Sequence, residues 1–192
     1  ALSVSGSLVE KLGGPSVRPY QPGGYWAHLN FPKRSYKSSS GGALYRRGLY
    51  TYWKRMALYP SFWILDAPTR QVCTMTRTIT NTPIQALVTL NDPVFFEAAR
   101  GFALRVLRGA PPGLKERVEL AFLIALSRPP QAEEEAAIGS LFRNLLKRYE
   151  ADLPAAARVH PGAAGLSASA ELAAWTILSS TLLNLDEAIT RE

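Results

Sequence analysis

Residues 80–100 read TNTPIQALVTLNDPVFFEAAR, and this stretch contains two helix starts in close succession. The segment TPIQ at 82–85 has the pattern of a capping box with proline in the first helical turn. The segment NDP at 91–93 repeats an N-cap followed by proline. The second helix is expected to run to Arg108, with five apolar side chains facing inward (Phe95, Ala98, Ala99, Phe102 and Val106). Capping therefore predicts two consecutive helices here.

Downstream of this stretch, apolar residues at helical spacing predict three more helices. They are expected at about 114–127, 131–150 and 168–190. The last has apolar residues at alternating steps of three and four (Trp175, Leu178, Leu182, Leu185 and Ile189). An Ala/Pro/Gly-rich linker is expected at 151–167, between the last two helices.

Upstream, the chain is less regular. Residues 1–12 have apolar side chains on one helical face but no cap at their start, so we expect the second half of a helix. Residues 15–42 form a long loop rich in Pro, Gly, Ser and Tyr. Residues 44–56 fit a helical stripe, although Tyr50 and Tyr52 alternate as in a strand. Helix is favoured there because no strand partner is evident.

These elements predict an all-α protein: an irregular helical domain with a long Pro/Gly/aromatic-rich loop region at the front and a helical bundle-like C-terminal half. Its 192 residues, 47% hydrophobic and 19% charged, fit one globular domain over 1–192. No apolar run approaches the roughly 18 residues that a membrane span needs. Within the domain we expect a front at 1–80 and a helical back at 81–192.

The two parts differ in charge. Residues 1–80 carry eleven lysines and arginines against only Glu10 and Asp66, a net charge of +9. Residues 81–192 carry eleven basic and thirteen acidic residues, a net charge of −2. Twelve of the nineteen aromatic residues precede Pro68. The front is therefore basic and aromatic, and it is the part in which a working surface is expected.

Four segments carry a family resemblance: GGPSVRPYQPGGYW at 13–26, LYRRGLYTYWKR at 44–55, DAPTRQVCT at 66–74 and ELAAWTILSSTLLNLDEAITRE at 171–192. Together with residues 80–100 and the segment ALSRPP at 125–130, they resemble the planctomycete-type C-terminal domain of unknown function 1553 family.

The resemblance implies the C-terminal part of a large exported protein, periplasmic or extracellular, which often also contains a second domain of unknown function and a cytochrome c module. The preceding domains of the same polypeptide, or a complementary chain, are then the expected partners. The family supplies no established catalytic residues.

Cofactor motifs are missing from the sequence. The single cysteine, Cys73, is followed by Thr74, so the Cys-x-x-Cys-His haem attachment pattern is absent. The two histidines, His28 and His160, are far apart in sequence, which also argues against a zinc site. We expect no cofactor and no metal in this chain, and haem only in associated modules.

Catalytic candidates are few, and each has a structural alternative. Cys73 with His28 has the residue types of a nucleophile and base, but a small buried cysteine in a short helix is the favoured interpretation. Asp66 would need a second carboxylate for glycoside hydrolysis. The favoured interpretation is that Asp66 caps a short helix through Cys73 and pairs with Arg70.

The candidate binding surface consists of aromatic and basic residues that local capping does not explain (Tyr45, Arg46, Arg47, Tyr52, Trp53, Arg55, Trp63 and Arg77). In the favoured interpretation, the aromatics are core and the charge complements acidic neighbouring domains. The second is an acidic polysaccharide, stacked on aromatics and held by arginines. Nucleic acid ranks last, because an exported protein rarely meets it.

The leading functional hypothesis is a non-catalytic structural and interaction module that docks neighbouring domains and presents a surface to polysaccharide. The alternative is a glycan-acting hydrolase, or a subunit of one, with Asp66, Arg70 and Arg77 near a cleft.

Overall fold

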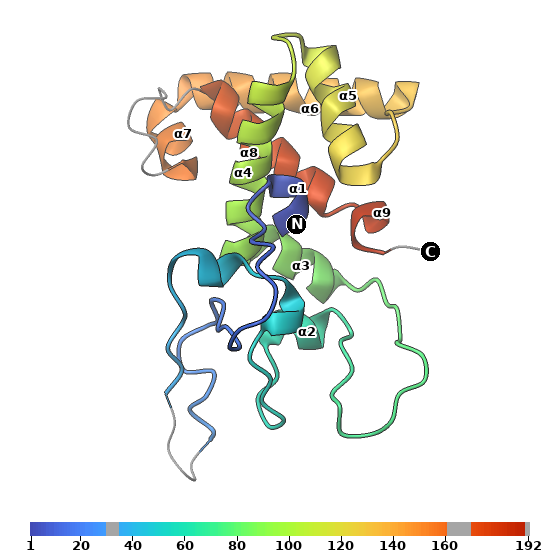
Figure 1. The fold of residues 1–192 in the computed structure, drawn as a ribbon. Coiled ribbons are helices and arrows are strands. Elements are labelled where there is room, and N and C mark those ends of the chain that lie inside the picture. The colour runs from blue at the N-terminus through green and yellow to red at the C-terminus, as the bar shows by residue number, and fades with distance from the viewer. Residues whose placement is uncertain (30–34, 161–169, 191–192) are drawn as a thin grey trace. The chain divides into compact units, whose positions relative to one another are not determined.

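The computed structural model describes residues 1–29, 35–160 and 170–190, and the chain forms two compact units. One unit consists of Ala1–Gly6 with Thr89 and the residues after it; the other consists of Ser7–Val88. The described residues contain nine α-helices and no β-strand (Figure 1). The predicted all-α class is therefore confirmed.

The helical unit is built around α8 (Ala170–Leu183), which packs against α4 (Pro93–Gly109), α6 (Ala132–Ala151) and α7 (Leu153–Val159). Eleven of the fourteen residues of α8 are buried, so the helix is covered on all sides. Trp175 is fully buried, and its ring lies 5.4 Å from that of Phe142 on α6. The unit is completed by α5 (Leu114–Leu126), α9 (Asp186–Ile189) and the short α1 (Leu2–Ser5).

Capping fixes the starts of these helices much as the sequence predicts. The Asp92 carboxylate accepts a hydrogen bond from Val94 N at 2.9 Å, and Pro93 occupies the first turn of α4. The Thr82 N–H donates to Gln85 Oε1 at 2.9 Å, which makes the predicted capping box at the start of α3 (Pro83–Asn91). The helices predicted at about 114–127 and 131–150 are confirmed as α5 and α6.

Two predictions about the C-terminal part need correction. The helix expected at 168–190 is two helices, because α8 ends at Leu183 and α9 begins at Asp186; residues 168 and 169 lie outside the described residues. The segment expected as a linker at 151–167 contains α7, which Asp152 caps by accepting from Ala155 N at 2.9 Å. Residues 161–167 of that segment also lie outside the described part.

The unit of residues 7–88 is irregular, with α2 (Pro60–Ile64), the first two turns of α3 and two 3₁₀ turns, at Gly41–Tyr45 and Gly48–Tyr50. The helix expected over 44–56 is wrong, since its backbone pairs with a distant segment instead. Val9 N donates to Tyr45 O at 2.9 Å, and Val17 N donates to Tyr50 O at 2.8 Å. Two isolated parallel bridges result, so the missing partner was the front of the chain.

Two more expected helices are shorter or missing. The helix predicted over residues 1–12 covers only Leu2–Ser5, because Gly6 adopts a left-handed backbone (φ 73°) and its N–H closes the last turn. The short helix expected after Asp66 is not formed. Asp66 itself has φ 59°, and residues 67–82 are non-helical up to the start of α3.

Candidate functional site

Arg46, expected on a binding surface, is instead buried and forms hydrogen bonds to the backbone of residues 11–15. It is only 7% exposed, and its guanidinium donates to the carbonyls of Lys11 (2.8 Å), Gly13 (2.5 Å) and Pro15 (3.1 Å). The guanidinium carbon also lies 3.7 Å from the centre of the Tyr50 ring. This placement corrects the expectation, because the donors of Arg46 are turned inward to the main chain.

Asp66 holds the base of the loop formed by residues 67–79. Its Oδ2 accepts hydrogen bonds from Thr80 N at 2.9 Å, Thr80 Oγ1 at 2.6 Å and Gln85 Nε2 at 3.1 Å. The hydroxyl of Thr80 is the main cause that lowers the pKa of this carboxyl below its usual value. The predicted pairing of Asp66 with Arg70 is wrong, and so is its role as a helix cap.

Arg77, near the end of the same loop, bonds to the residues that precede the start of the loop. Its guanidinium donates to Asp66 O at 3.0 Å and to Leu65 O. Gln85, which is 2% exposed, adds a third connection by donating to Ile64 O at 2.9 Å. From the sequence, Gln85 was identified only as part of a capping box. Thr80 was missed as a partner of Asp66, although a hydroxyl residue two positions before the N-cap could have indicated it.

A hollow of about 460 Å³ lies beside this loop within residues 7–88. Two predicted site residues, Trp53 and Arg77, line it together with the weak candidate Arg70. Its other lining residues, which sequence inspection did not single out, are mainly apolar (Gly48, Leu49, Thr51, Phe62, Leu65, Ala67 and Pro68). No acidic side chain belongs to this lining set.

Arg70 and Trp53 form a cation–π pair at this hollow. The guanidinium carbon of Arg70 lies 4.2 Å from the centre of the Trp53 ring, within the range of a cation–π contact. The Phe62 ring also lies close to Trp53, with 6.0 Å between the two ring centres. Arg70 has φ 60°, a left-handed backbone that costs a non-glycine residue about 1 kcal/mol. No local motif around Arg70 predicts this conformation.

The remaining predicted surface residues are spread over the unit. Arg47 and Arg55 are exposed, and Trp63 is 66% exposed on α2. Tyr45 and Tyr52 are half-buried, and Tyr52 lies between Arg18, 4.8 Å from its ring, and Trp26. None of these five residues lines the hollow.

Cys73 is exposed on the loop of residues 67–79, which corrects the expectation of a buried cysteine in a helix. His28 lies elsewhere: its Nδ1 is 3.0 Å from Tyr25 O and its Nε2 is 3.4 Å from Met56 O. The described residues contain no group of three His, Cys, Asp or Glu side chains placed to hold a metal ion. They also contain no helix that is long and apolar enough to cross a membrane.

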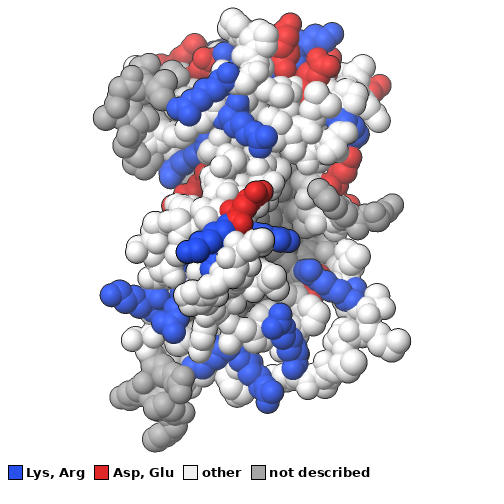
Figure 2. All heavy atoms as spheres, in the orientation of Figure 1, with Lys and Arg blue, Asp and Glu red and all other residues white. Residues whose placement is uncertain are grey.

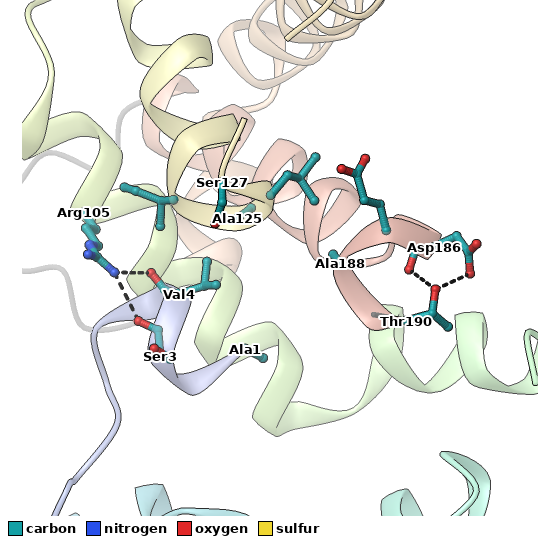
Figure 3. Close-up of a pocket in the computed structure, with 12 residues that line it drawn as sticks. Ala1, Ser3, Val4, Arg105, Ala125, Ser127, Asp186, Ala188 and Thr190 are labelled. Carbon is teal, nitrogen blue, oxygen red and sulfur yellow. Dashed lines mark hydrogen bonds between the residues drawn. The ribbon is translucent and has the colours of Figure 1, made fainter. Parts of the chain in front are cut away.

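A second hollow lies in the helical unit, between α1, the end of α5 and α9 (Figure 3). Its volume is about 830 Å³. Arg105 at its edge already donates to Ser3 O at 3.1 Å and Val4 O at 2.9 Å. Asp186 on the opposite side accepts from Thr190 Oγ1 at 3.2 Å. Its charged groups are thus engaged within the protein, which makes this hollow the weaker candidate.

The two units also differ in charge. Residues 7–88 carry all eleven basic residues of the front half and only two carboxylates, Glu10 and Asp66. Figure 2 shows Lys and Arg side chains spread over the surface built by this unit, with few acidic side chains among them. On the face drawn there, the helices of the other unit carry both acidic and basic side chains.

The fold and the site together define an all-α protein with a basic, aromatic unit that contains a hollow lined by arginine, tryptophan and apolar side chains. The chain belongs to the family described as PSD1: Protein of unknown function (DUF1553), which matches residues 1–142. No curated protein and no solved structure matches the chain.

Proposed function

We propose that this chain is a non-catalytic interaction module whose unit of residues 7–88 binds an anionic partner, with acidic polysaccharide as the ligand. The observation that carries the proposal is the hollow beside Arg70. Its lining combines an arginine in cation–π contact with Trp53 and apolar side chains, without an acidic residue, in a unit with a net charge of +9. Such a field attracts polyanions and raises their rate of association.

Docking of neighbouring domains is the second part of the proposal. The loop of residues 67–79 exposes three apolar side chains, Val72, Met75 and Ile79, and Met75 is 98% exposed. Exposed apolar groups clustered on one loop favour contact with another protein surface. In the proposal, the neighbouring domains belong to a large exported protein, and some of them are of the cytochrome c type.

The hydrolase alternative has less support. Two-carboxylate glycoside hydrolysis needs a second carboxyl group about 5–9 Å from the first. Glu10 is the only other carboxylate among residues 7–88. Asp66 is also committed through Oδ2 to Thr80 and Gln85, and its lowered pKa favours the ionised form, which suits a general acid poorly.

Titration calorimetry with charged and neutral polysaccharides tests the proposal. We expect binding to dextran sulfate or polygalacturonate, weakening as salt rises, and none to neutral dextran. Absence of binding to both polyanions at low salt would overturn the proposal. Release of reducing ends from the bound polysaccharide, lost in an Asp66→Asn variant, would instead support the hydrolase.

A further inference from the structure

We propose that the hollow beside Arg70 is a subsite for one uronic-acid residue, with Arg70 bound to its carboxylate; this inference rests on the polysaccharide binding proposed above. The ligand is thus a polyuronate. The assignment follows from the N–H donors and the backbone conformation of Arg70, the apolar lining of the hollow and the contacts of the Trp53 ring.

The guanidinium of Arg70 is held in place but not used by the protein. A cation–π contact holds the guanidinium carbon 4.2 Å from the centre of the Trp53 ring, and such a contact does not use the N–H donors as hydrogen bonds to acceptors do. Among the described residues, the structure gives this side chain no hydrogen-bond acceptor and no ion-pair partner. A planar fork of N–H donors matches a planar carboxylate, which it binds through two parallel hydrogen bonds.

The Arg70 backbone supports the same assignment. Its φ of 60° is unfavourable for arginine, whereas glycine or asparagine would adopt it at little cost. Strained residues of this kind cluster at ligand-binding sites. Arginine at this position therefore costs stability that a smaller residue would not, and a ligand contact accounts for that cost.

The walls of the hollow suit a sugar ring rather than a bare ion. Leu49, which is 74% exposed, and Phe62 and Pro68 present apolar surface next to the guanidinium. Gly48 lets the Phe62 ring come close, because a Cβ atom there would lie 3.2 Å from Phe62 Cζ. A pyranose uronate has one apolar ring face and one charged edge, and a hollow of about 460 Å³ is of the size that small ligands occupy.

Nucleic acid fits this hollow less well. Single-stranded nucleic acid binds by stacking bases on open aromatic faces. Trp53 is half-buried, and its ring is already in contact with the Arg70 guanidinium, 4.2 Å from the ring centre, with the Phe62 ring close by. The aromatic residue here orients the arginine and does not serve as a platform for a base.

The test compares a galacturonate tetrasaccharide with its fully methyl-esterified form, which keeps the rings and removes the charges. Binding is measured by calorimetry on the full chain and on three variants. Arg70→Asn keeps the left-handed backbone, Arg70→Lys keeps the charge without the fork, and Lys37→Asn removes an exposed positive charge of the same unit outside the hollow. Thermal unfolding of each variant verifies that it is folded.

We expect both Arg70 variants to bind the tetrasaccharide at least tenfold more weakly, Lys37→Asn to stay within threefold of the wild type, and the methyl ester to bind poorly. Equal losses at Arg70 and Lys37, or equal binding of the ester, would overturn the subsite while leaving polyanion binding intact. Tighter binding of tetraglutamate than of the tetrasaccharide would overturn it in favour of an acidic peptide. Failure of the wild type to bind dextran sulfate or any polyuronate would remove the proposed function as well.

Discussion

Arg46 and Arg47 are adjacent in sequence and have opposite environments. Arg46 is buried with its donors on three main-chain carbonyls, whereas Arg47 is exposed. A buried guanidinium is tolerated only where hydrogen bonds offset the loss of its hydration, and bonds from a charged donor contribute more than neutral ones. The two arginines therefore contribute very differently to stability, although the sequence motif LYRRGLY presents them as a pair.

Replacing Arg46 with methionine should lower the free energy of unfolding by about 2–4 kcal/mol, because three carbonyls lose a charged donor. The matched control, Arg47→Met, should change it by less than about 0.5 kcal/mol. Chemical denaturation followed by tryptophan fluorescence measures both. Similar losses in the two variants would contradict the role given to Arg46.

His160 is a second residue whose environment has a measurable consequence. Its Nε2 lies 2.9 Å from Thr176 Oγ1, and the Thr176 hydroxyl donates to Leu172 O at 2.8 Å. The hydroxyl proton is thus already used, so Nε2 of His160 must be the donor. Burial, followed by the charge of Arg100, lowers the pKa of His160 below its usual 6.5.

A histidine with a lowered pKa binds its proton more readily in the unfolded chain than in the folded one. Its contribution to stability is therefore complete above about pH 6.5 and is lost as the pH falls through the folded-state pKa. We expect His160→Gln to flatten the acid side of the profile of unfolding free energy against pH, measured from pH 7.5 to 4.5. Parallel profiles for the two proteins would show that His160 does not titrate in this way.

At the scale of elements, the loop of residues 67–79 has a closed base and an open body. Asp66, Arg77 and Gln85 tie its two ends together, while every residue from Pro68 to Ile79 is exposed. The loop is thus positioned by side-chain hydrogen bonds at its two ends, together with the contact of Arg70 with Trp53. Its position should depend strongly on one carboxylate.

Asp66→Asn should therefore increase the rate of trypsin cleavage after Arg70 and Arg77 several-fold, because the amide is a weaker acceptor for the Thr80 and Gln85 donors. Mass spectrometry of the fragments identifies the cut sites. An Asp186→Asn variant, changed in the helical unit, serves as the control and should leave these rates unaltered. The wild-type loop should also become more sensitive to cleavage by an acid-stable protease as the pH falls, since protonation of Asp66 removes the same acceptor.

Sequence reasoning succeeded where the decisive contacts are local. The caps of α3 and α4 lie within three residues of the backbone groups that they satisfy, so TPIQ and NDP predict both helix starts. Residues 44–56 were misjudged because their backbone partners, Val9 and Val17, lie more than thirty residues away. Helix α7 was missed for another reason: its Ala/Pro composition outweighed the cap signal of Asp152.

For the candidate site the limit was similar. Three of the residues that the sequence singled out, Trp53, Arg70 and Arg77, line one hollow. The sequence did not distinguish Arg70 from Arg46 and Arg77, which donate hydrogen bonds to backbone carbonyls, because such acceptors carry no sequence signal. The left-handed backbone of Arg70 likewise follows from the tertiary structure and has no local motif.

At the scale of the whole molecule, the main hydrophobic core belongs to the helical unit alone. Its buried members come from α4 to α8, with Trp175, Leu178 and Leu182 of α8 at the centre. The buried residues of the other unit, among them Val17, Trp26 and Tyr59, are not members of this core. A substitution in the interior of one unit should therefore lower the stability of that unit more than that of the other.

Leu178→Ala should cost about 2–5 kcal/mol and accelerate hydrogen exchange in α4, α6 and α8. The same substitution at the exposed Leu153 should cost less than about 0.5 kcal/mol. Arg46→Met should instead accelerate exchange in residues 7–60. Exchange followed by mass spectrometry resolves these patterns, and uniform acceleration along the chain by either variant would contradict the division into two units.

The exposed position of Cys73 has a practical consequence for all of these measurements. It is the only cysteine in the sequence, and it lies three residues from Arg70 on a loop whose neck is fixed. A thiol-reactive dye would attach there in a single step, without removal of competing thiols. The unaltered chain thereby becomes an optical reporter, in which a change of emission on adding an oligosaccharide would follow events beside Arg70 in real time.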